Sequence, residues 1–304
     1  MCPHVKIEGT KLIGKGVFMN KFEVLNHEPS LLPEGEWKLV FADEFDGDSL
    51  DKTKWGFRKH ILREEHPFLI EDEGLEFENS NIHFKLVEKD GQYYSCQLQT
   101  GENWHDRPSE CKNWLVAPFS TPKFEHKFGY YECRCKLQKE KGDIWWSAFW
   151  LQSPIIGTHI DPKKAGVEVD IMESFAGGTY QHHYLHWGGY SPENHQFATT
   201  FKEHRYARAE EFIPIDTDEF HRFGCLWEED GYTFFVDGKQ CGRKLTEAVS
   251  HTECFILLGT EVFGAPSRGG GIPGYMKEEN KGNLPQNGED EFVVDYVRVF
   301  DLVK

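Results

Sequence analysis

Three acidic residues lie within six positions of one apolar run, Glu168-Val169-Asp170-Ile171-Met172-Glu173. The Val, Ile and Met residues are typical of a buried strand, where acids rarely occur without a reason. In a regular strand Glu168 and Asp170 share one face and Glu173 points to the other. One extra residue, a β-bulge near Ile171-Met172, would return Glu173 to the face of the other two acids. Carboxylates gathered on one face push each other's pKa values apart, which is what acid–base catalysis needs.

The spacing of the outer two acids is compatible with a retaining glycosidase. If the bulge absorbs one residue, Glu168 and Glu173 lie about four strand steps apart, roughly 13 Å along the backbone. Two Glu side chains that lean toward each other would shorten this to a gap compatible with the ~5–5.5 Å expected between the carboxyl groups of a retaining enzyme. The alternative interpretation is an acidic, solvent-facing edge of a strand.

Length and composition favour one large all-β domain. The chain has 304 residues, 14% of them aromatic, with 29 glycines and 14 prolines that punctuate it at short intervals. These features are typical of a β-sandwich. The formal net charge of −17 argues against nucleic acid as a partner, because nucleic-acid-binding proteins carry a basic surface. It also makes a strongly anionic polymer a less favourable substrate.

The sequence contains no run of ~18 apolar residues that would span a membrane. Its first six residues, Met1-Cys2-Pro3-His4-Val5-Lys6, lack the apolar core of a signal peptide, so we expect a cytoplasmic protein, or a secreted one if a signal has been removed. The 8 cysteines have no CxxC spacing. Cys133 and Cys135 alternate along a strand-like run and are interpreted as small core residues, and we expect free thiols in a reducing compartment.

The chain divides into an N-terminal extension, residues 1–34, and one domain, residues 35–304. Short apolar runs separated by turns predict strands, and alternating helices are not expected, so the fold is a sandwich and not a βαβ fold. Asp237-Gly238 is a strong hairpin-turn signal. Two long loops are expected, at residues 153–166 and 264–290, and either could wall a cleft. The expected strands cover residues 39–41, 82–86, 129–137, 145–151, 168–173, 184–187, 222–227, 232–236 and 292–300.

These segments resemble glycoside hydrolase family 16, which includes β-glucanases, agarases and carrageenases. The resemblance runs from about Trp37 to Val303. It rests on residues 37–47 with Leu50-Asp51 and Trp55, on Phe128-Gly129-Tyr130-Tyr131-Glu132 with Arg134 and Lys136, on Trp146-Ser147-Ala148-Phe149-Trp150-Leu151, and on Val294-Asp295-Tyr296-Val297-Arg298-Val299. It implies a concanavalin-like β-jelly-roll sandwich with an open concave cleft.

The resemblance also implies roles for the three acids. Glu168 is similar to the family's nucleophile, Asp170 to its assisting acid and Glu173 to its general acid/base. The five-residue step from Glu168 to Glu173 is the bulged variant, which is similar to laminarinases, agarases and carrageenases. The mechanism that this implies is retention through a glycosyl-enzyme intermediate. The chain departs from the family pattern at Ser147, where many relatives have proline, and at Cys133 and Cys135, where small alanines are common.

Aromatic and histidine residues near the acids are candidate substrate contacts, because sugar rings stack on aromatic side chains. Trp146 and Trp150 precede the acidic strand; Trp146 is the expected platform, and Trp150 is equally compatible with the core. His186 and Trp187 lie in a segment that resembles the border of the catalytic centre in laminarinases. His186 is expected to contact Asp170 or the sugar, with simple packing as the alternative. A zinc site among the histidines is not expected, because their spacing fits no common site.

Many relatives bind a structural calcium on the convex face, and Glu44 and Asp295 are the matching residues here. A surface carboxylate and a hydrogen-bonded acid are the alternative interpretations of the two. No cofactor is expected for catalysis.

The leading hypothesis is a retaining, endo-acting β-glycanase that hydrolyses a polysaccharide or oligosaccharide, above all β-1,3-glucan of the laminarin type. The main alternative is an agarase-, porphyranase- or carrageenase-like β-galactanase. A non-catalytic carbohydrate-binding jelly roll is a third interpretation, disfavoured because all three acids are present, and a transglycosylase is a fourth. We expect a monomer with no nucleic-acid or membrane partner.

Overall fold

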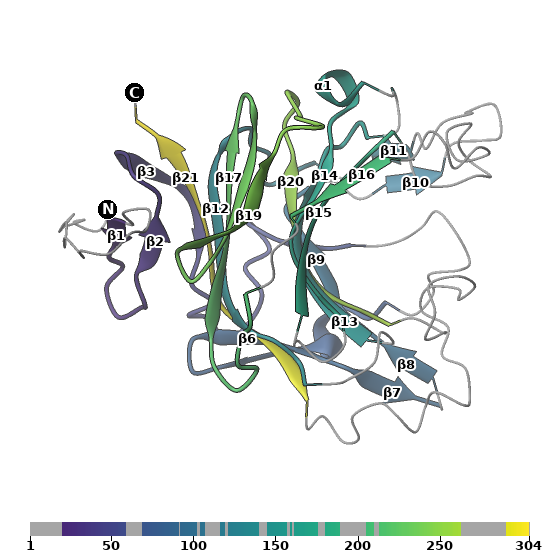
Figure 1. Ribbon diagram of the computed structural model, residues 1–304. Helices are drawn as coiled ribbons and strands as arrows, with labels where there is room; N and C mark the ends of the chain where they lie inside the picture. Colours follow the sequence, from purple (N-terminus) through teal and green to yellow (C-terminus); the bar gives the residue numbers. More distant parts are fainter. Residues whose placement is uncertain are drawn as a thin grey trace.

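Two antiparallel sheets stacked face to face make up the body of the protein (Figure 1). The computed structural model describes residues 20–58, 69–90, 92–101, 104–106, 116–118, 121–139, 145–156, 159, 161–175, 180–188, 205–209, 213–262 and 290–303. Within these ranges every pair of named strands is antiparallel, as expected for strands joined by turns. The predicted all-β sandwich is therefore confirmed.

The seven-stranded sheet carries the acidic strand and is called the front sheet. Its order is β16 (Arg205–Arg208), β15 (Tyr180–Trp187), β14 (Glu168–Phe175), β13 (Trp145–Gln152), β20 (Phe255–Val262), β9 (Gln97–Gln99) and β4 (Gly56–Phe57). β14 lies near the middle of this sheet, between β13 and β15. The face of the front sheet that is turned away from the other sheet is called the front face.

The eight-stranded back sheet covers the other side of the core. Its order is β19 (Lys239–Leu245), β18 (Gly231–Val236), β17 (His221–Glu228), β12 (Gly129–Lys136), β21 (Glu291–Leu302), β6 (Asn81–Lys85) and β5 (Leu75–Glu78), with β3 (Trp37–Asp43) also paired to β21. The remaining elements are the pairs β1 (Asn20–Phe22) with β2 (Ser30–Leu32), β7 (Val87–Lys89) with β8 (Gln92–Tyr94) and β10 (Trp104–Asp106) with β11 (Val116–Pro118), the 3₁₀ helix η1 (Asp72–Gly74) and the helix α1 (Pro162–Ala165).

The hydrophobic core lies between the sheets. Alternate residues of each strand point into it, so that Val169 of β14 and Leu185 of β15 meet Phe223 and Phe234 of the back sheet in one buried cluster. Cys133 and Cys135 are fully buried in the same cluster with free thiols, and their interpretation as small core residues is confirmed.

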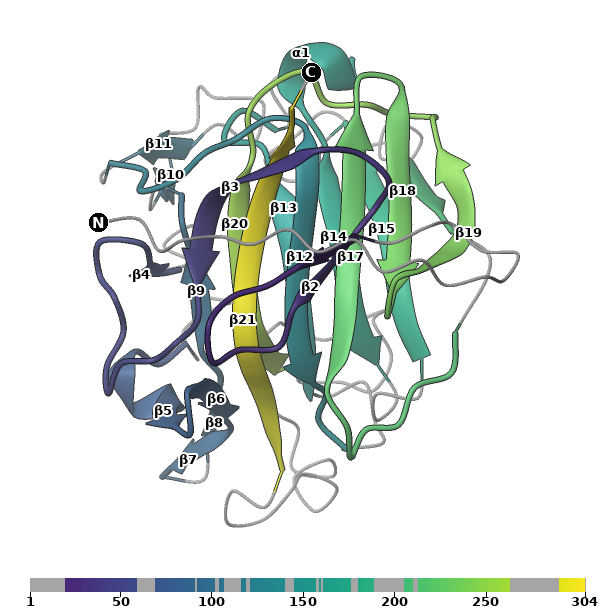
Figure 2. The same ribbon diagram turned by 90° about the vertical axis from the view of Figure 1, so that its left-hand side faces the viewer.

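The described part of the N-terminal extension, residues 20–34, packs on the outer face of the back sheet (Figure 2). Phe22 and Leu32 join Tyr130, Phe300 and other residues in a second apolar cluster. The rings of Phe22 and Phe300 meet edge to face, with centroids 5.0 Å apart. This hairpin is therefore part of the packed structure.

Polar contacts fix the same hairpin. The backbone N–H of Leu31 donates to the carboxylate of Glu132, which is fully buried and also accepts a hydrogen bond from the Tyr296 hydroxyl. Burial raises the pKa of Glu132 above its usual value, although the hydrogen bonds to it act in the opposite direction. Removal of the hairpin would expose this polar cluster to water.

Most of the expected strands occur within one or two residues of their predicted bounds. Asp237 and Gly238 both have positive φ, +48° and +75°, which is the geometry of the predicted tight hairpin turn. The expected loop at 153–166 contains α1, and most of the loop at 264–290 lies outside the described residues. None of the helices in the described ranges is long and apolar enough to cross a membrane.

Candidate active site

The acidic strand β14 contains the β-bulge. On the β13 side Glu173 pairs with Ala148 and Asp170 pairs with Trp150, so three steps on β14 match two on β13. On the β15 side Glu173 pairs with His182 and Asp170 with Tyr184, so the two residues between the acids face one residue of β15. The extra residue of β14 is Ile171, where the sequence predicts it.

The bulge puts the three acids on the front face. Glu168, Asp170 and Glu173 lie opposite Gln152, Trp150 and Ala148, which alternate along β13 and therefore share one face. The residues between the acids are buried in the core on the other side of the sheet. Glu168 and Glu173 are partly exposed, whereas Asp170 is buried at 3% exposure. The structure thus brings together the three predicted catalytic residues.

His186 lies beside these acids, on β15 directly opposite Glu168. Its Nε2 atom is 3.3 Å from the Oδ2 atom of Asp170, which makes an ion pair. Burial by itself would lower the pKa of His186, but Asp170 and the charges of Glu168 and Glu173 outweigh it and raise the pKa to about 9. The imidazole is therefore positively charged at neutral pH, and the predicted contact with Asp170 is present.

Ligand-type atoms of Glu168, Asp170 and His186 all lie within 4.8 Å of one another. Two carboxylates and an imidazole are a donor set that binds divalent metals when the imidazole is neutral. A protonated imidazole has no lone pair to offer a metal, so the raised pKa of His186 favours an ion-pair cluster over a metal centre.

Two glutamines hold the strands on either side of the acids. The side-chain amide of Gln152 donates to Glu168 at 3.3 Å. Gln138, which is fully buried, donates to the carbonyls of Trp145 and Ser174 and accepts a 2.6 Å hydrogen bond from Ser147. Ser147, the departure from the family pattern, thus ties β13 to the residue that follows Glu173 on β14.

The start of β14 is fixed by a short helix and a glycine. Asp161 caps α1 by accepting a hydrogen bond from the Lys163 N–H at 3.0 Å, and Gly166 ends the helix with φ +82°. A Cβ atom at Gly166 would lie 2.2 Å from the Cβ of Ser153, so only glycine fits here. This packing sets where the acidic strand begins.

The predicted aromatic contacts differ in position. Trp150 lies opposite Asp170, is partly exposed, and has the guanidinium of Arg58 4.7 Å from its ring centroid. Trp146 shares the strand face of Trp150 but is only 5% exposed, and its role as a platform stays a prediction. Trp187 is 7% exposed and belongs to the core cluster between the sheets. The substrate-binding assignment of Trp187 is therefore corrected: next to His186 on a strand, it points to the opposite side.

The two residues named for calcium, Glu44 and Asp295, lie together on the outer side of the back sheet. Arg298 donates to both oxygens of Glu44 at 2.9 and 2.6 Å, and Arg134 donates to Asp295. His27 Nδ1 lies 3.8 Å from Glu44 and 3.9 Å from Asp295. Calcium takes 6–8 oxygen ligands. As they lie here, these two acids are engaged by nitrogen groups and do not fit a calcium ion.

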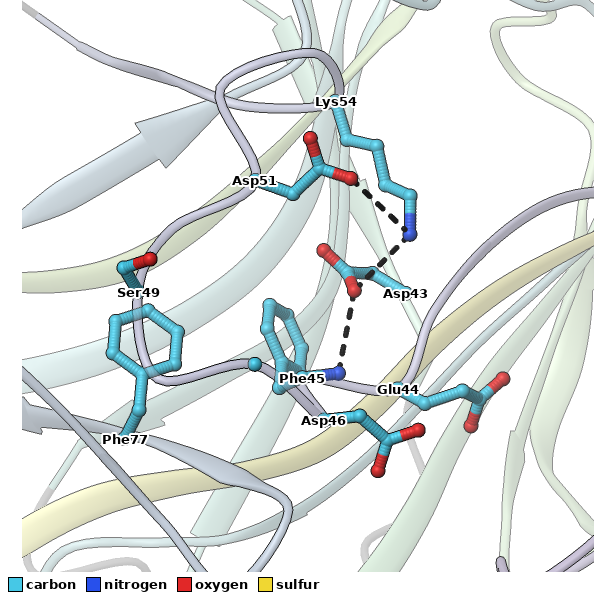
Figure 3. A pocket seen from close by; sticks show the side chains of 9 residues that line it. Asp43, Glu44, Phe45, Asp46, Ser49, Asp51, Lys54 and Phe77 are labelled. Atoms are coloured by element: carbon cyan, nitrogen blue, oxygen red, sulfur yellow. Dashed lines mark hydrogen bonds and ion pairs between the residues drawn. The ribbon is translucent and has the colours of Figure 1, made fainter.

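A neighbouring cavity of about 290 Å³ is lined by Asp43, Glu44, Asp46 and Asp51, among others (Figure 3). Asp43 and Asp51 point toward Lys54, whose Nζ atom is 3.2 and 3.7 Å from them. Asp43 also accepts a 2.7 Å hydrogen bond from the Trp55 indole. The acids of this cavity therefore have partners within the protein, and the cavity lies apart from the acidic strand.

The comparison with known families identifies the chain's family. Residues 37–302 match the family described as beta-porphyranase A–D, GH16 domain. The chain belongs to glycoside hydrolase family 16. The match begins at the start of β3 and excludes the N-terminal hairpin of residues 20–34.

Three relatives illustrate the range of this family. Glucan endo-1,3-beta-glucosidase A1 of Niallia circulans is 24% identical over 86% of this chain and 37% of its own length. Beta-porphyranase B of Zobellia galactanivorans is 22% identical over 76% of each chain. The laminarinase catalytic domain of Thermotoga petrophila is 23% identical, with a TM-score of 0.57 over 89% of this chain and 100% of that one. This last likeness concerns the fold, and it agrees with the predicted jelly roll.

Sequence reasoning did not identify four residues that shape the site: Arg58, Gln138, Gln152 and His183. Gln152 was accessible to such reasoning, because it alternates with Trp150 along β13. The other three reach the site from distant strands, or act from the core side, so no local pattern marks them.

Proposed function

We propose that this protein is a retaining, endo-acting β-glycanase with β-1,3-glucan as its substrate. The observation that carries the proposal is the bulge at Ile171, which aligns Glu168, Asp170 and Glu173 on the front face. A solvent-facing acidic edge would need neither a bulge in the middle of a sheet nor a buried aspartate paired with a histidinium.

The proposed reaction gives each acid a distinct role, and Glu173 acts in both steps. Glu168 attacks the anomeric carbon and forms a glycosyl-enzyme ester, while Glu173 gives its proton to the departing glycosidic oxygen. In the second step Glu173 takes a proton from water as the water oxygen attacks the anomeric carbon. The carboxylate of Glu168 is released, and the sugar keeps its original anomeric configuration. Asp170, held by His186 at 3.3 Å, lies between the two and assists Glu168.

β-1,3-Glucan is preferred because of relatives and charge. The curated relative that the chain matches over 86% of its length is an endo-1,3-glucosidase, although the chain spans little more than a third of that protein. The net charge of −17 also favours a neutral polymer over a strongly anionic one.

A β-galactan of the porphyran type is the second candidate. The family description and the relative from Zobellia galactanivorans both name porphyranases. The guanidinium of Arg58 over Trp150 adds a positive group next to Asp170, where it could meet an anionic substituent of a sugar.

The test is the activity of purified protein on laminarin, mixed-linkage β-glucan, agarose, porphyran and carrageenan, with products sized by chromatography. A ladder of oligosaccharides from laminarin, with retained anomeric configuration by NMR, would support the proposal. Cleavage of porphyran alone would replace the substrate and keep the mechanism. A Glu168→Gln variant measured in parallel excludes a contaminating hydrolase, and no cleavage of any polymer would contradict the proposal.

A further inference from the structure

The bulge that aligns the acids leaves backbone groups without their regular ladder partners. Ile171 has no Cα partner on β13, and Ile171 and Met172 together face the single residue His183 on β15. Both side chains are fully buried, so the carbonyl of Ile171 lies away from water. A buried carbonyl that leaves the ladder needs another donor, or the local conformation is lost.

His183 is that donor. Its Nδ1 atom lies 2.6 Å from the carbonyl oxygen of Ile171, and the residue is 2% exposed. A carbonyl oxygen only accepts hydrogen bonds, so Nδ1 carries the proton. The contact bridges β14 and β15 at the one position where the two strands are out of step.

The ring of His183 is held from the other side as well. It stacks on Phe234 of β18 in the back sheet, with centroids 5.0 Å apart and planes 20° apart. The rigid core therefore fixes the ring, and the ring fixes the carbonyl. Because the neighbouring Tyr184 lies opposite Asp170 on the front face, His183 points into the core and does not share the face of the acids.

We propose that His183 is a positioning residue, which holds the bulge and thereby keeps Glu173 on the same face as Glu168 and Asp170. It acts through the backbone of β14 and touches neither acid nor substrate. Without its N–H, the carbonyl of Ile171 would seek another donor, and the simplest relaxation is a regular strand. In a regular strand Glu173 turns away from the other two acids. The assignment rests on the proposed role of Glu173 as acid/base.

The test compares His183→Phe, which keeps an aromatic ring but loses the donor, with His183→Asn, whose amide restores an N–H near the position of Nδ1. We expect the Phe variant to lose about 100-fold or more in kcat on the polysaccharide, with KM little changed, because general acid–base catalysis by Glu173 contributes about 10²–10⁴-fold. The first-turnover release of an activated aryl leaving group should fall far less, since it needs no proton from Glu173. The Asn variant should recover most of the loss.

The control variant is His221→Phe, which breaks the 2.6 Å contact with Asp237 on the back sheet and leaves the hydrogen bond from His183 to Ile171 in place. It should lower the melting temperature without separating the two classes of substrate. Equal losses on both substrates in His183→Phe, or no recovery in His183→Asn, would overturn the proposal.

Nitrogen NMR of the wild-type protein tests the hydrogen bond directly. It requires neither a folded variant nor catalytic activity. The His183 ring should be protonated at Nδ1, and a neutral ring protonated only at Nε2 would overturn the proposal. If the wild type cleaved no glycan, the proposed function would fail, whereas the hydrogen bond from His183 would still be tested by this spectrum.

Discussion

The two sheets each contain a bulge next to an acid, and the two bulges have opposite surroundings. In the front sheet the extra residue Ile171 returns Glu173 to the face of Glu168 and Asp170. In the back sheet the pairing of β12 with β21 skips Asp295, whose carboxylate meets Arg134. The same backbone device thus displays acids on two outer faces of one sandwich.

The difference lies in the balance of charge. On the front face three carboxylates face two positive groups, the imidazolium of His186, whose pKa they raise to about 9, and the guanidinium of Arg58 over Trp150. On the outer side of the back sheet two guanidinium groups and the imidazole of His27 meet three carboxylates, those of Glu44, Asp46 and Asp295. Balanced, fixed pairs are typical of structure, whereas acids in excess of cations are typical of chemistry.

The largest effect is expected at Glu168. Glu168→Gln removes the nucleophile while keeping its shape and its neighbour Gln152. We expect turnover to fall by more than about 10³-fold with the melting temperature nearly unchanged. The measurement is kcat on the active polymer together with thermal unfolding. Residual activity close to that of the wild type would show that Glu168 is not the nucleophile and that the front face is not the catalytic face.

Glu173→Gln should separate substrates by leaving group. A sugar leaving group needs a proton, so its cleavage should slow by about 10²–10⁴-fold, whereas the first turnover of an activated aryl glycoside should slow much less. Steady-state and burst kinetics on both substrates measure this. Equal losses would contradict the acid role and leave Glu173 as a structural carboxylate, like those of the back sheet.

Arg298→Met should affect stability and not turnover. Arg298 is fully buried and donates to Glu44, to the Glu28 carbonyl and to Ser30. Its loss leaves a largely buried carboxylate without its fork of donors, which costs about 3–5 kcal/mol of unfolding free energy.

The matched control is Arg243→Met, whose partner Glu247 is four residues away on a partly exposed surface. It should cost no more than about 0.5 kcal/mol. Denaturant unfolding of both variants gives the difference. A large fall in kcat of folded Arg298→Met would mean that the back cluster also supports catalysis, and the contrast would fail.

These contrasts were only partly accessible from the sequence. The acids Glu168, Asp170 and Glu173 and the bulge near Ile171 follow from strand periodicity, because a period of two leaves Glu173 on the wrong face of an apolar strand. The contact between His186 and Asp170 is one of the alternatives that the sequence allows. Periodicity predicts nine of the described strands, and it misses others, among them β20 with its apolar run Phe255-Ile256-Leu257-Leu258.

The rest depends on contacts between distant strands. Trp187 is an exception, because the alternation of strand residues alone places it on the side opposite His186, in the core. His27 reaches Glu44 and Asp295 from a hairpin that lies outside the family match, so no motif of the family includes it. His183 needs both the bulge carbonyl and Phe234. Local patterns reveal on which face of a strand a residue lies, but not which residue of another strand it contacts on that face.

The pH dependence of activity tests the charge on His186. Its pKa is raised from 6.5 to about 9, so the stability that the ion pair with Asp170 contributes is fully present below about pH 6.5 and is lost as pH rises through about 9. We expect activity to fall in the same upper range and the stability contribution of this pair to disappear with it. In His186→Gln the alkaline fall near pH 9 should vanish, whereas in His221→Gln, which lies on the back sheet, it should persist. A fall that persists in His186→Gln would assign it to another group.

The smallest expected effect is that of a chelator. Glu44 and Asp295 already have Arg298, Arg134 and His27 as partners, so calcium would have to displace an imidazole held within 4 Å of both acids. We expect EDTA, or added calcium at millimolar concentration, to leave the melting temperature within about 1 °C. A chelator that lowers the melting temperature of the wild type would mean that a metal, and not the protein's own cations, balances the back cluster.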